Sequence, residues 1–181
     1  MTDTIIENIV VSTQVSNSFD ISLLAEKLPG SSYNPDEFNG LTIKFETPKI
    51  AVLIMSNGKL ICTGGKNQEE IKKSIEKTIT KIKEAGFDIK QNYKIKYENI
   101  VASTDLRKSM DLEKISKGLP IQNVTYDPSE FPGIIYKADD YNSILLLFSS
   151  GKIVCTGAKE IEAATKAIEM LKEKLTSIGA L

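Results

Sequence analysis

The chain has 181 residues, of which 41% are hydrophobic and 26% are charged, as is usual for a soluble globular protein. Its 23 basic and 24 acidic residues give a net charge of −1, which excludes a general basic coat for nucleic acid. The chain has no histidine, and no set of paired carboxylates, metal ligands or nucleophile and base stands out. We therefore expect no enzyme activity, no metal and no cofactor.

Nothing in the sequence indicates a membrane protein. No segment approaches the roughly 18 apolar residues of a membrane span, and the N-terminus lacks a signal segment. We expect a cytoplasmic protein that does not contact membranes. In that compartment Cys62 and Cys155 are expected to be buried, reduced thiols and not a disulfide.

The first half of the chain predicts strands and helices in a mixed order. β-Branched residues from Ile5 to Val15 indicate a strand, and the apolar spacing of residues 20–28 indicates a short helix. Further strands are expected at 31–33, 41–46, 50–55 and 60–63. The Asn57-Gly58 pair predicts a hairpin between the last two strands. From Gln68 an amphipathic helix follows, which ends at Ala85-Gly86.

The second half follows the same plan. The expected elements are a strand at 100–103, a short helix at 111–117, strands at 134–137, 143–148 and 153–156, and a helix at 161–178. This order predicts helices on one face of an antiparallel sheet, so that its other face meets solvent or a partner.

Three sequence motifs occur twice, in the same order. Residues 33–40 return as 126–133, residues 56–66 return as 149–159, and Glu-Asn-Ile-Val occurs at 7–10 and at 98–101. Two long units do not make a solenoid, which needs several short ones. We expect two repeats, at 1–90 and 91–181, related by a pseudo-twofold axis and each carrying one copy of every site.

Apolar side chains occur on both faces of the predicted strands. If Val52 and Ile54 face the helices, then Ala51, Leu53 and Met55 are uncovered, and in the second repeat the uncovered residues are Ile144, Leu146 and Phe148. The small Cys62 and Cys155 belong under the helices, which turns Ile61, Thr63, Val154 and Thr156 outward. An apolar surface of this extent predicts a binding partner.

The glycines that follow Thr63 and Thr156 resemble a phosphate-binding loop only superficially. That loop requires a glycine where Leu60 stands and a Ser or Thr where Asn67 stands. Glycine at a corner between strand and helix is explained by its conformational freedom.

The doubled motifs Asn-Ile-Val, Tyr-Asx-Pro-x-x-Phe-x-Gly and Ser-x-Gly-Lys-x-x-Cys-Thr-Gly-x-Lys closely resemble the conserved core of the TATA-box-binding protein family, from about Ile5 to the C-terminus. With nothing beyond that core, the chain resembles the archaeal form. The resemblance implies an α+β fold in which two pseudo-symmetric repeats form a ten-stranded antiparallel saddle-shaped sheet, with four helices on the convex face.

The resemblance also implies a function. It implies a general transcription initiation factor that binds the minor groove of TATA-box promoter DNA, kinks it with apolar wedges and nucleates the pre-initiation complex. Phe38 with Met55 and Phe131 with Phe148 would form the wedge pairs, although the family has Phe where Met55 stands. Asn8, Asn99, Thr63 and Thr156 would donate hydrogen bonds near the centre of the DNA site. The remaining expected DNA contacts are an apolar floor of Val10, Leu53, Ile61, Val101, Leu146 and Val154, and phosphate-binding lysines at Lys44, Lys59, Lys137 and Lys152.

The family contacts its transcription factor B partner through an acidic stretch of the second repeat. That stretch corresponds here to Asp127, Ser129 and Glu130, of which two are acidic. Further implied associations are an indirect one with RNA polymerase, self-association through the concave face, and a place on the nucleoid.

Two other hypotheses remain open. One is a repair or nuclease accessory domain that uses the same saddle, although such a domain is normally fused to a catalytic one. The other is a helix-on-sheet module that binds an apolar ligand or a protein on its bare face. Comparing the binding of a TATA duplex with that of a G·C-substituted duplex separates these hypotheses from promoter recognition.

Overall fold

A computed structural model describes residues 3–181 of the chain. It divides into two compact units, one spanning Asn8–Glu98 and the other spanning Asn99–Leu181 together with the described residues before Asn8. The boundaries fall inside two strands, because β1 (Ile5–Gln14) passes through Asn8 and β6 (Ile95–Asp105) passes through Asn99.

After β1, the Asn8–Glu98 unit contains two helices and four strands. They are α1 (Ile21–Lys27), β2 (Ser31–Tyr33), β3 (Gly40–Glu46), β4 (Lys49–Met55), β5 (Lys59–Gly65) and α2 (Gln68–Glu84). After β6, the second unit contains α3 (Leu112–Gly118), β7 (Val124–Thr125), β8 (Gly133–Ala138), β9 (Ser143–Phe148), β10 (Lys152–Ala158) and α4 (Ile161–Ser177). Two short 3₁₀ turns, η1 (Ile121–Asn123) and η2 (Asp139–Tyr141), also belong to the second unit.

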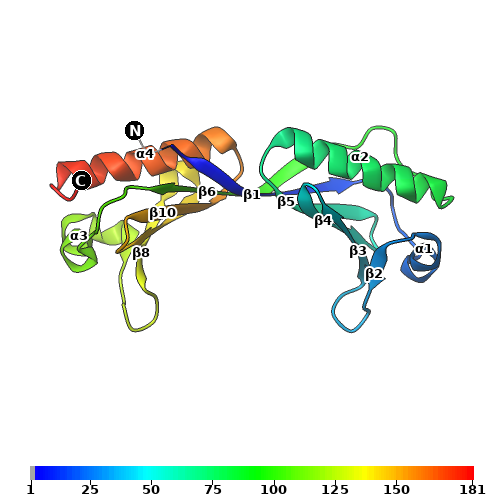
Figure 1. Cartoon of the computed structure of the whole chain (residues 1–181), viewed down its shortest axis with the longest axis horizontal. Coiled ribbons are helices and arrows are strands. Elements are labelled where there is room, and N and C mark those ends of the chain that lie inside the picture. Colours follow the sequence, from blue (N-terminus) through cyan, green and yellow to red (C-terminus); the bar gives the residue numbers. More distant parts are fainter. Residues whose placement is uncertain (1–2) are drawn as a thin grey trace. The chain divides into compact units, whose positions relative to one another are not determined.

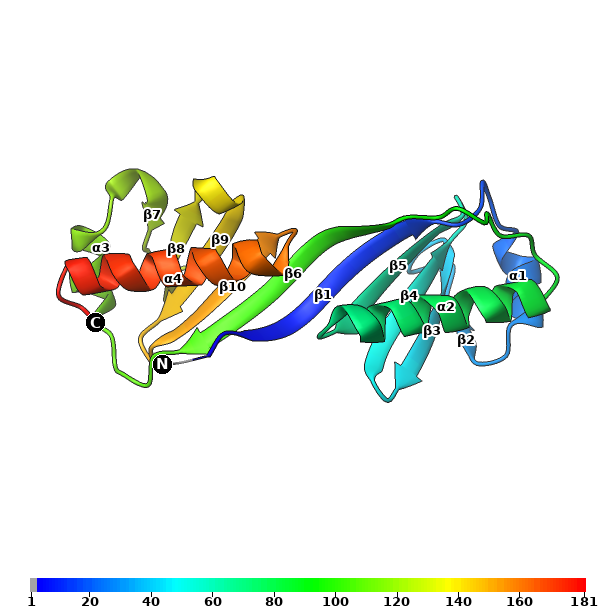
Figure 2. The ribbon, with the colours of Figure 1, turned by 90° about the horizontal axis from the view of Figure 1, so that it is seen from above.

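The strands are hydrogen-bonded in the order β2-β3-β4-β5-β1-β6-β10-β9-β8-β7. This arrangement confirms the predicted ten-stranded antiparallel sheet with four α-helices. Within each unit, the long helix lies across the strands on one side of the sheet, as α2 does over β4 and β5 and α4 does over β9 and β10 (Figures 1 and 2). No helix within residues 3–181 is long and apolar enough to cross a membrane.

Each core lies between a long helix and the helix-facing side chains of the strands. In α2 the buried residues include Ile71, Ile75, Ile79 and Ile82, which recur at helical spacing. In α4 they are Ala164, Ala167, Ile168, Leu171 and Leu175. Cys62 and Cys155 are fully buried beneath these helices, and burial raises the pKa of the Cys62 thiol to about 12. The prediction of buried, free thiols is confirmed.

Side-chain caps fix where several helices begin. Asp20 Oδ1 accepts a hydrogen bond from Leu23 N (3.1 Å), and Asp111 Oδ1 accepts one from Lys114 N (3.1 Å). Asn67 Oδ1 accepts one from Glu70 N (2.9 Å). A cap of this kind contributes about 1 kcal/mol by satisfying an otherwise free N–H group at the start of the helix.

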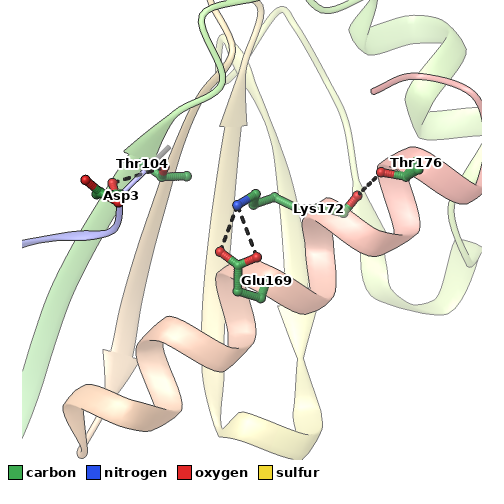
Figure 3. A network of polar contacts seen from close by, with 5 residues as sticks. All are labelled: Asp3, Thr104, Glu169, Lys172 and Thr176. Carbon is green, nitrogen blue, oxygen red and sulfur yellow. Dashed lines mark hydrogen bonds and ion pairs between the residues drawn. The ribbon is translucent and has the colours of Figure 1, made fainter. Parts of the chain in front are cut away.

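The second unit also contains a polar network around α4 (Figure 3). Lys172 Nζ lies 2.8 Å and 3.1 Å from the two carboxylate oxygens of Glu169, and Thr176 Oγ1 donates to the Lys172 carbonyl. Thr104 Oγ1 donates to the carbonyl of Asp3 at 3.3 Å, which joins Asp3 to β6 of this unit (Figure 3).

Candidate nucleic-acid interface

The strands of the Asn8–Glu98 unit bear a second set of side chains on the side away from α1 and α2, which we call its open face. The register pairs Thr42 with Leu53, Leu53 with Ile61, and Ile61 with Ser12, so one row crosses four strands. A parallel row contains Lys44, Ala51, Thr63 and Val10. The apolar members of these rows are only half-buried, whereas Val52, Ile54 and Cys62 on the other parity are fully buried. The predicted alternation along β4 and β5 is confirmed.

The Asn99–Leu181 unit has an equivalent open face. Its first row contains Ile135, Leu146, Val154 and Ser103, and its second contains Lys137, Ile144 and Thr156. Ile144 is 39% exposed, Leu146 and Val154 are half-buried, and the alternating Leu145 and Leu147 are fully buried. Val101 is half-buried and has the parity of Ser103 along β6. Each unit therefore presents an uncovered apolar strip with polar groups at its ends.

Asn8 is fixed at the end of the first open face by two atoms of β5, Gly64 N and Thr63 Oγ1. Its Oδ1 accepts a hydrogen bond from Gly64 N at 2.7 Å, and its Nδ2 lies 3.4 Å from Thr63 Oγ1. Gly64 has a φ of 104°, and a Cβ there would lie 2.6 Å from the carbonyl oxygen of Lys49, so only glycine fits this corner.

Asn99 repeats this arrangement in the second unit. Gly157 N donates to its Oδ1 at 2.7 Å, and its Nδ2 donates to Thr156 Oγ1 at 3.3 Å. Because a backbone N–H group can only donate, the oxygen of each carboxamide is identified by its partner and the –NH₂ group must point the other way. The bond to the threonine hydroxyl uses one N–H of each –NH₂ group, so a bound acceptor could engage the second. That these two asparagines donate to DNA stays a prediction, and the structure supplies a reason for the orientation of their side chains.

The expected wedge residues lie beside strand ends. The rings of Phe131 and Phe148 have centroids 5.8 Å apart and planes tilted by 58°. Both rings lie against Gly133, where an added Cβ would be 3.0 Å from Phe131 and 3.3 Å from Phe148. In the first unit Gly40 pairs with Met55, and an added Cβ would lie 2.6 Å from the Phe38 ring. All four side chains are half-buried, and each glycine provides the space for its phenylalanine.

The four expected phosphate-binding lysines lie on strands of the open faces. Lys44, Lys137 and Lys152 are exposed and Lys59 is half-buried. Lys152 is paired in register with Asp105, whereas Lys59 is paired with the neutral Gln14. The two repeats therefore differ in local charge at this position, although the lysines themselves are equivalent.

Two carboxylates on the open faces were not identified as site residues from the sequence. Ser12 Oγ donates to Glu98 Oε1 at 2.7 Å, and Ser103 Oγ donates to Glu7 Oε1 at 2.6 Å. Each serine is the last member of an apolar row, and each is nearly buried. The doubled Glu-Asn-Ile-Val motif could have identified these glutamates, because both copies of the motif contain a glutamate directly before the asparagine.

The loop between β7 and β8 holds the three residues expected to bind a partner. Asp127 Oδ1 accepts hydrogen bonds from Ser129 N at 3.0 Å and from Ser129 Oγ at 2.6 Å. These bonds, led by that from the Ser129 hydroxyl, lower the pKa of Asp127. Glu130 is exposed, and its N–H donates to the Asp127 carbonyl at 3.1 Å. Asp127 therefore orders the loop, and Glu130 is the carboxylate with more freedom to meet a partner.

Comparisons with known proteins agree with this geometry. A family model described as "Transcription factor TFIID (or TATA-binding protein, TBP)" matches residues 3–85 and 94–178. Across 97% of its length the chain is 43% identical to the TATA-box-binding protein of Picrophilus torridus, of which it covers 96%. It has the same identity and coverage with the TATA-box-binding protein of Methanothermobacter thermautotrophicus. The solved structure "Methanococcus jannaschii TBP" is 37% identical and matches with a TM-score of 0.85, over 97% of this chain and 99% of that one.

Proposed function

The chain belongs to the TATA-binding protein family, as its doubled motifs predict, and from this premise we propose that it is a transcription initiation factor that binds the minor groove of TATA-box promoter DNA. The observation that carries the proposal is the doubled open face, in which a fixed amide donor, an apolar strip and a wedge pair recur in each unit. Each unit would read one half of the DNA element.

The chemistry of the open faces favours A·T base pairs. In the minor groove an A·T pair presents only hydrogen-bond acceptors, whereas a G·C pair adds the guanine amino group, which is a donor. The outward N–H groups of Asn8 and Asn99 complement acceptors, and the apolar strips offer nothing to the guanine donor. A guanine amino group pressed against Leu53 or Leu146 would lose its water without gaining a partner.

We further propose that the wedge pairs kink the DNA. Apolar side chains inserted between base steps unstack them, and the bent duplex then covers more protein surface. Pyrimidine–purine steps such as TA unstack most easily, which adds sequence preference at steps that make few polar contacts. The rings of Phe131 and Phe148 contact each other in a tilted arrangement, with centroids 5.8 Å apart, and would enter as one unit.

The bent complex would then nucleate the pre-initiation complex on the nucleoid, in the cytoplasm. Glu130 and its loop would contact transcription factor B, which brings RNA polymerase indirectly. Before DNA binds, the apolar strips would favour self-association through the open faces, which would compete with the duplex.

The decisive experiment compares three duplexes of one length by fluorescence anisotropy. The first carries a TATA element, the second replaces its A·T pairs by G·C, and the third replaces them by inosine·cytosine. Inosine·cytosine keeps the G·C major groove but lacks the guanine amino group, so minor-groove reading predicts tight binding to the first and third duplexes only. Equal affinity for all three would favour the alternative of a repair or nuclease accessory domain that uses the same saddle, and no response to any duplex would favour an open face that binds a protein or an apolar ligand. Energy transfer between dyes at the duplex ends tests the kink, and gel mobility with purified transcription factor B tests the assembly.

A further inference from the structure

A groove in the Asn99–Leu181 unit lies away from the open face, between α3 and the C-terminal end of α4. It has a volume of about 540 Å³, which is within the range of small-ligand and peptide-anchor sites. Its apolar lining comes from Ile115, Gly118 and Ile178, and Lys108, Lys114 and Lys117 stand around it. We call it the α3–α4 groove. None of these residues belongs to the proposed DNA contacts.

The first repeat shows what can occupy such a groove. There the chain leaves α2 through Gly86 and places Phe87 so that its N–H donates to the Ile82 carbonyl. The second repeat leaves α4 in the same way through Gly179, and Ala180 N donates to the Leu175 carbonyl. Phe87 is thus the equivalent of Ala180, and an aromatic ring in one unit is replaced by a methyl group in the other.

The partner of that ring is equivalent in the two units as well. Phe87 packs edge-on against Phe19, with 6.2 Å between ring centroids. Phe19 N donates to the Ser56 carbonyl at 2.8 Å, and Met110 N makes the matching bond to the Ser149 carbonyl at 2.8 Å. Met110 therefore stands in the place of Phe19, without a ring at residue 180 to pack against. The α3–α4 groove lies beside the position that Phe87 fills in the first unit.

The charges around the groove are specific to the second repeat. At the corresponding positions of the first repeat, Asn17 replaces Lys108, Leu23 replaces Lys114 and Glu26 replaces Lys117. Lys108 Nζ donates to the Ala180 carbonyl at 3.1 Å, which fixes one cation at the mouth. Lys117 pairs with Glu113 at 2.8 Å, but both side chains are 72% exposed, so this pair is weak and exchangeable. Asp111 is the one acidic residue of the lining, and its Oδ1 is already engaged as the cap of α3.

We propose that the α3–α4 groove docks an acidic segment of a partner protein, which inserts one aromatic side chain over Ile115 and Ile178 and places its carboxylates against the three lysines. We infer the aromatic anchor from Phe87, which fills the equivalent position in the first repeat. We infer the acidic flanks from the three lysines around the groove, which outnumber its one acidic residue. Because the groove is separate from the open face, this docking does not require the duplex to be released.

The test uses a fluorescein-labelled synthetic peptide with one phenylalanine between two pairs of glutamates, titrated with the intact protein. Anisotropy should rise and saturate. A peptide with alanine in place of phenylalanine should bind about tenfold more weakly or worse, because the buried anchor is lost. A peptide with glutamine in place of glutamate should bind more weakly and lose its dependence on salt.

Protein variants locate the binding. Ala180→Phe fills the groove with the residue type of the first repeat and should reduce peptide affinity about tenfold. The double variant Lys114→Leu with Lys117→Glu restores first-repeat residues and should weaken binding without affecting the core, so it serves even if the phenylalanine variant folds poorly. Lys83→Glu, on the last turn of α2, lowers the net charge by two at a site away from the groove, against three in the double variant, and should bind as the parent does. Affinity for the TATA duplex should be unchanged in the double variant.

Two results would overturn the proposal. One is the absence of saturable binding by the phenylalanine peptide. The other is equal loss of binding in Lys83→Glu and in the double variant, which would indicate attraction to any surface lysine. Neither result depends on whether the duplex binds.

Discussion

Replacing Asn99 with Asp exchanges an –NH₂ group for a carboxylate oxygen and leaves the shape of the side chain unchanged. In the free protein, the aspartate can keep the hydrogen-bond partners that Asn99 has now. The oxygen that accepts from Gly157 N at 2.7 Å is retained, and the new oxygen lies where Thr156 Oγ1, 3.3 Å from the present Nδ2, can donate to it. We therefore expect the Asn99→Asp protein to fold with nearly the parent melting temperature.

Binding to DNA should suffer far more than folding. The donor that faces a base acceptor becomes an anion, so a hydrogen bond is lost and a charge is placed against acceptors without a partner. Such a group costs about 3 kcal/mol or more, which is about two orders of magnitude in affinity. Fluorescence anisotropy with a TATA duplex measures this loss at fixed ionic strength, and circular dichroism checks the fold.

The matched control is Asn92→Asp, which adds the same charge at an exposed residue of the segment between α2 and β6. Its affinity should differ only slightly from that of the parent, because an exposed charge off the contact surface is screened by salt. If Asn99→Asp folds and binds the duplex with the parent affinity, the open face does not read the bases and the reasoning fails.

Four further outcomes are expected. Phe148→Ala should cost a few kcal/mol of duplex affinity and reduce bending measured by energy transfer, whereas Met55→Ala should cost less, and full bending by the Phe148 variant would exclude it as a wedge. Lys137→Gln should lower the slope of log affinity against log salt by about 1, with base preference unaltered; an unchanged slope would mean that this lysine meets no phosphate. Glu98→Gln can keep its bond with Ser12 while removing a negative charge, so anisotropy should report a higher duplex affinity. A lower duplex affinity would mean that the carboxylate itself contributes to DNA binding. Since burial raises the pKa of Cys62 to about 12, the thiol is covered and stays protonated at mildly alkaline pH; iodoacetamide should label it only after denaturation, and rapid labelling of native protein would contradict the packing.

Much of the fold was accessible from the sequence because its signals are local and occur twice. The alternation that separates Leu53 from Val52 needs only the period of a strand, and it is confirmed by their burial. The repeat also allowed each assignment to be checked at the equivalent residue of the other half. Cys62 and Cys155, for example, are equivalent, and both are buried as predicted. The start of β6 was placed too late, at Ile100 and not at Ile95, because Lys96 and Glu98 interrupt the apolar pattern there.

What the sequence did not reveal depends on contacts between distant residues. The orientation of the Asn99 carboxamide depends on the N–H group of Gly157, which lies far along the chain. The bond between Ser12 and Glu98 joins residues of two strands, and neither residue is unusual by itself. The α3–α4 groove depends on how α3 packs beside the end of α4, which no local pattern of the sequence predicts.

The position of the unit boundaries within β1 and β6 has a consequence for the origin of the molecule. Asp3 and Glu7 make their contacts with Thr104 and Ser103, so these two residues belong to the unit formed by the second half of the chain. An ancestor that carried a single copy of the repeat could complete such a unit only by exchanging the start of its first strand with another molecule. After gene duplication, the same exchange of strands would take place between the two halves of a single chain. From then on the two copies were free to diverge, and one now has Phe87 where the other has Ala180.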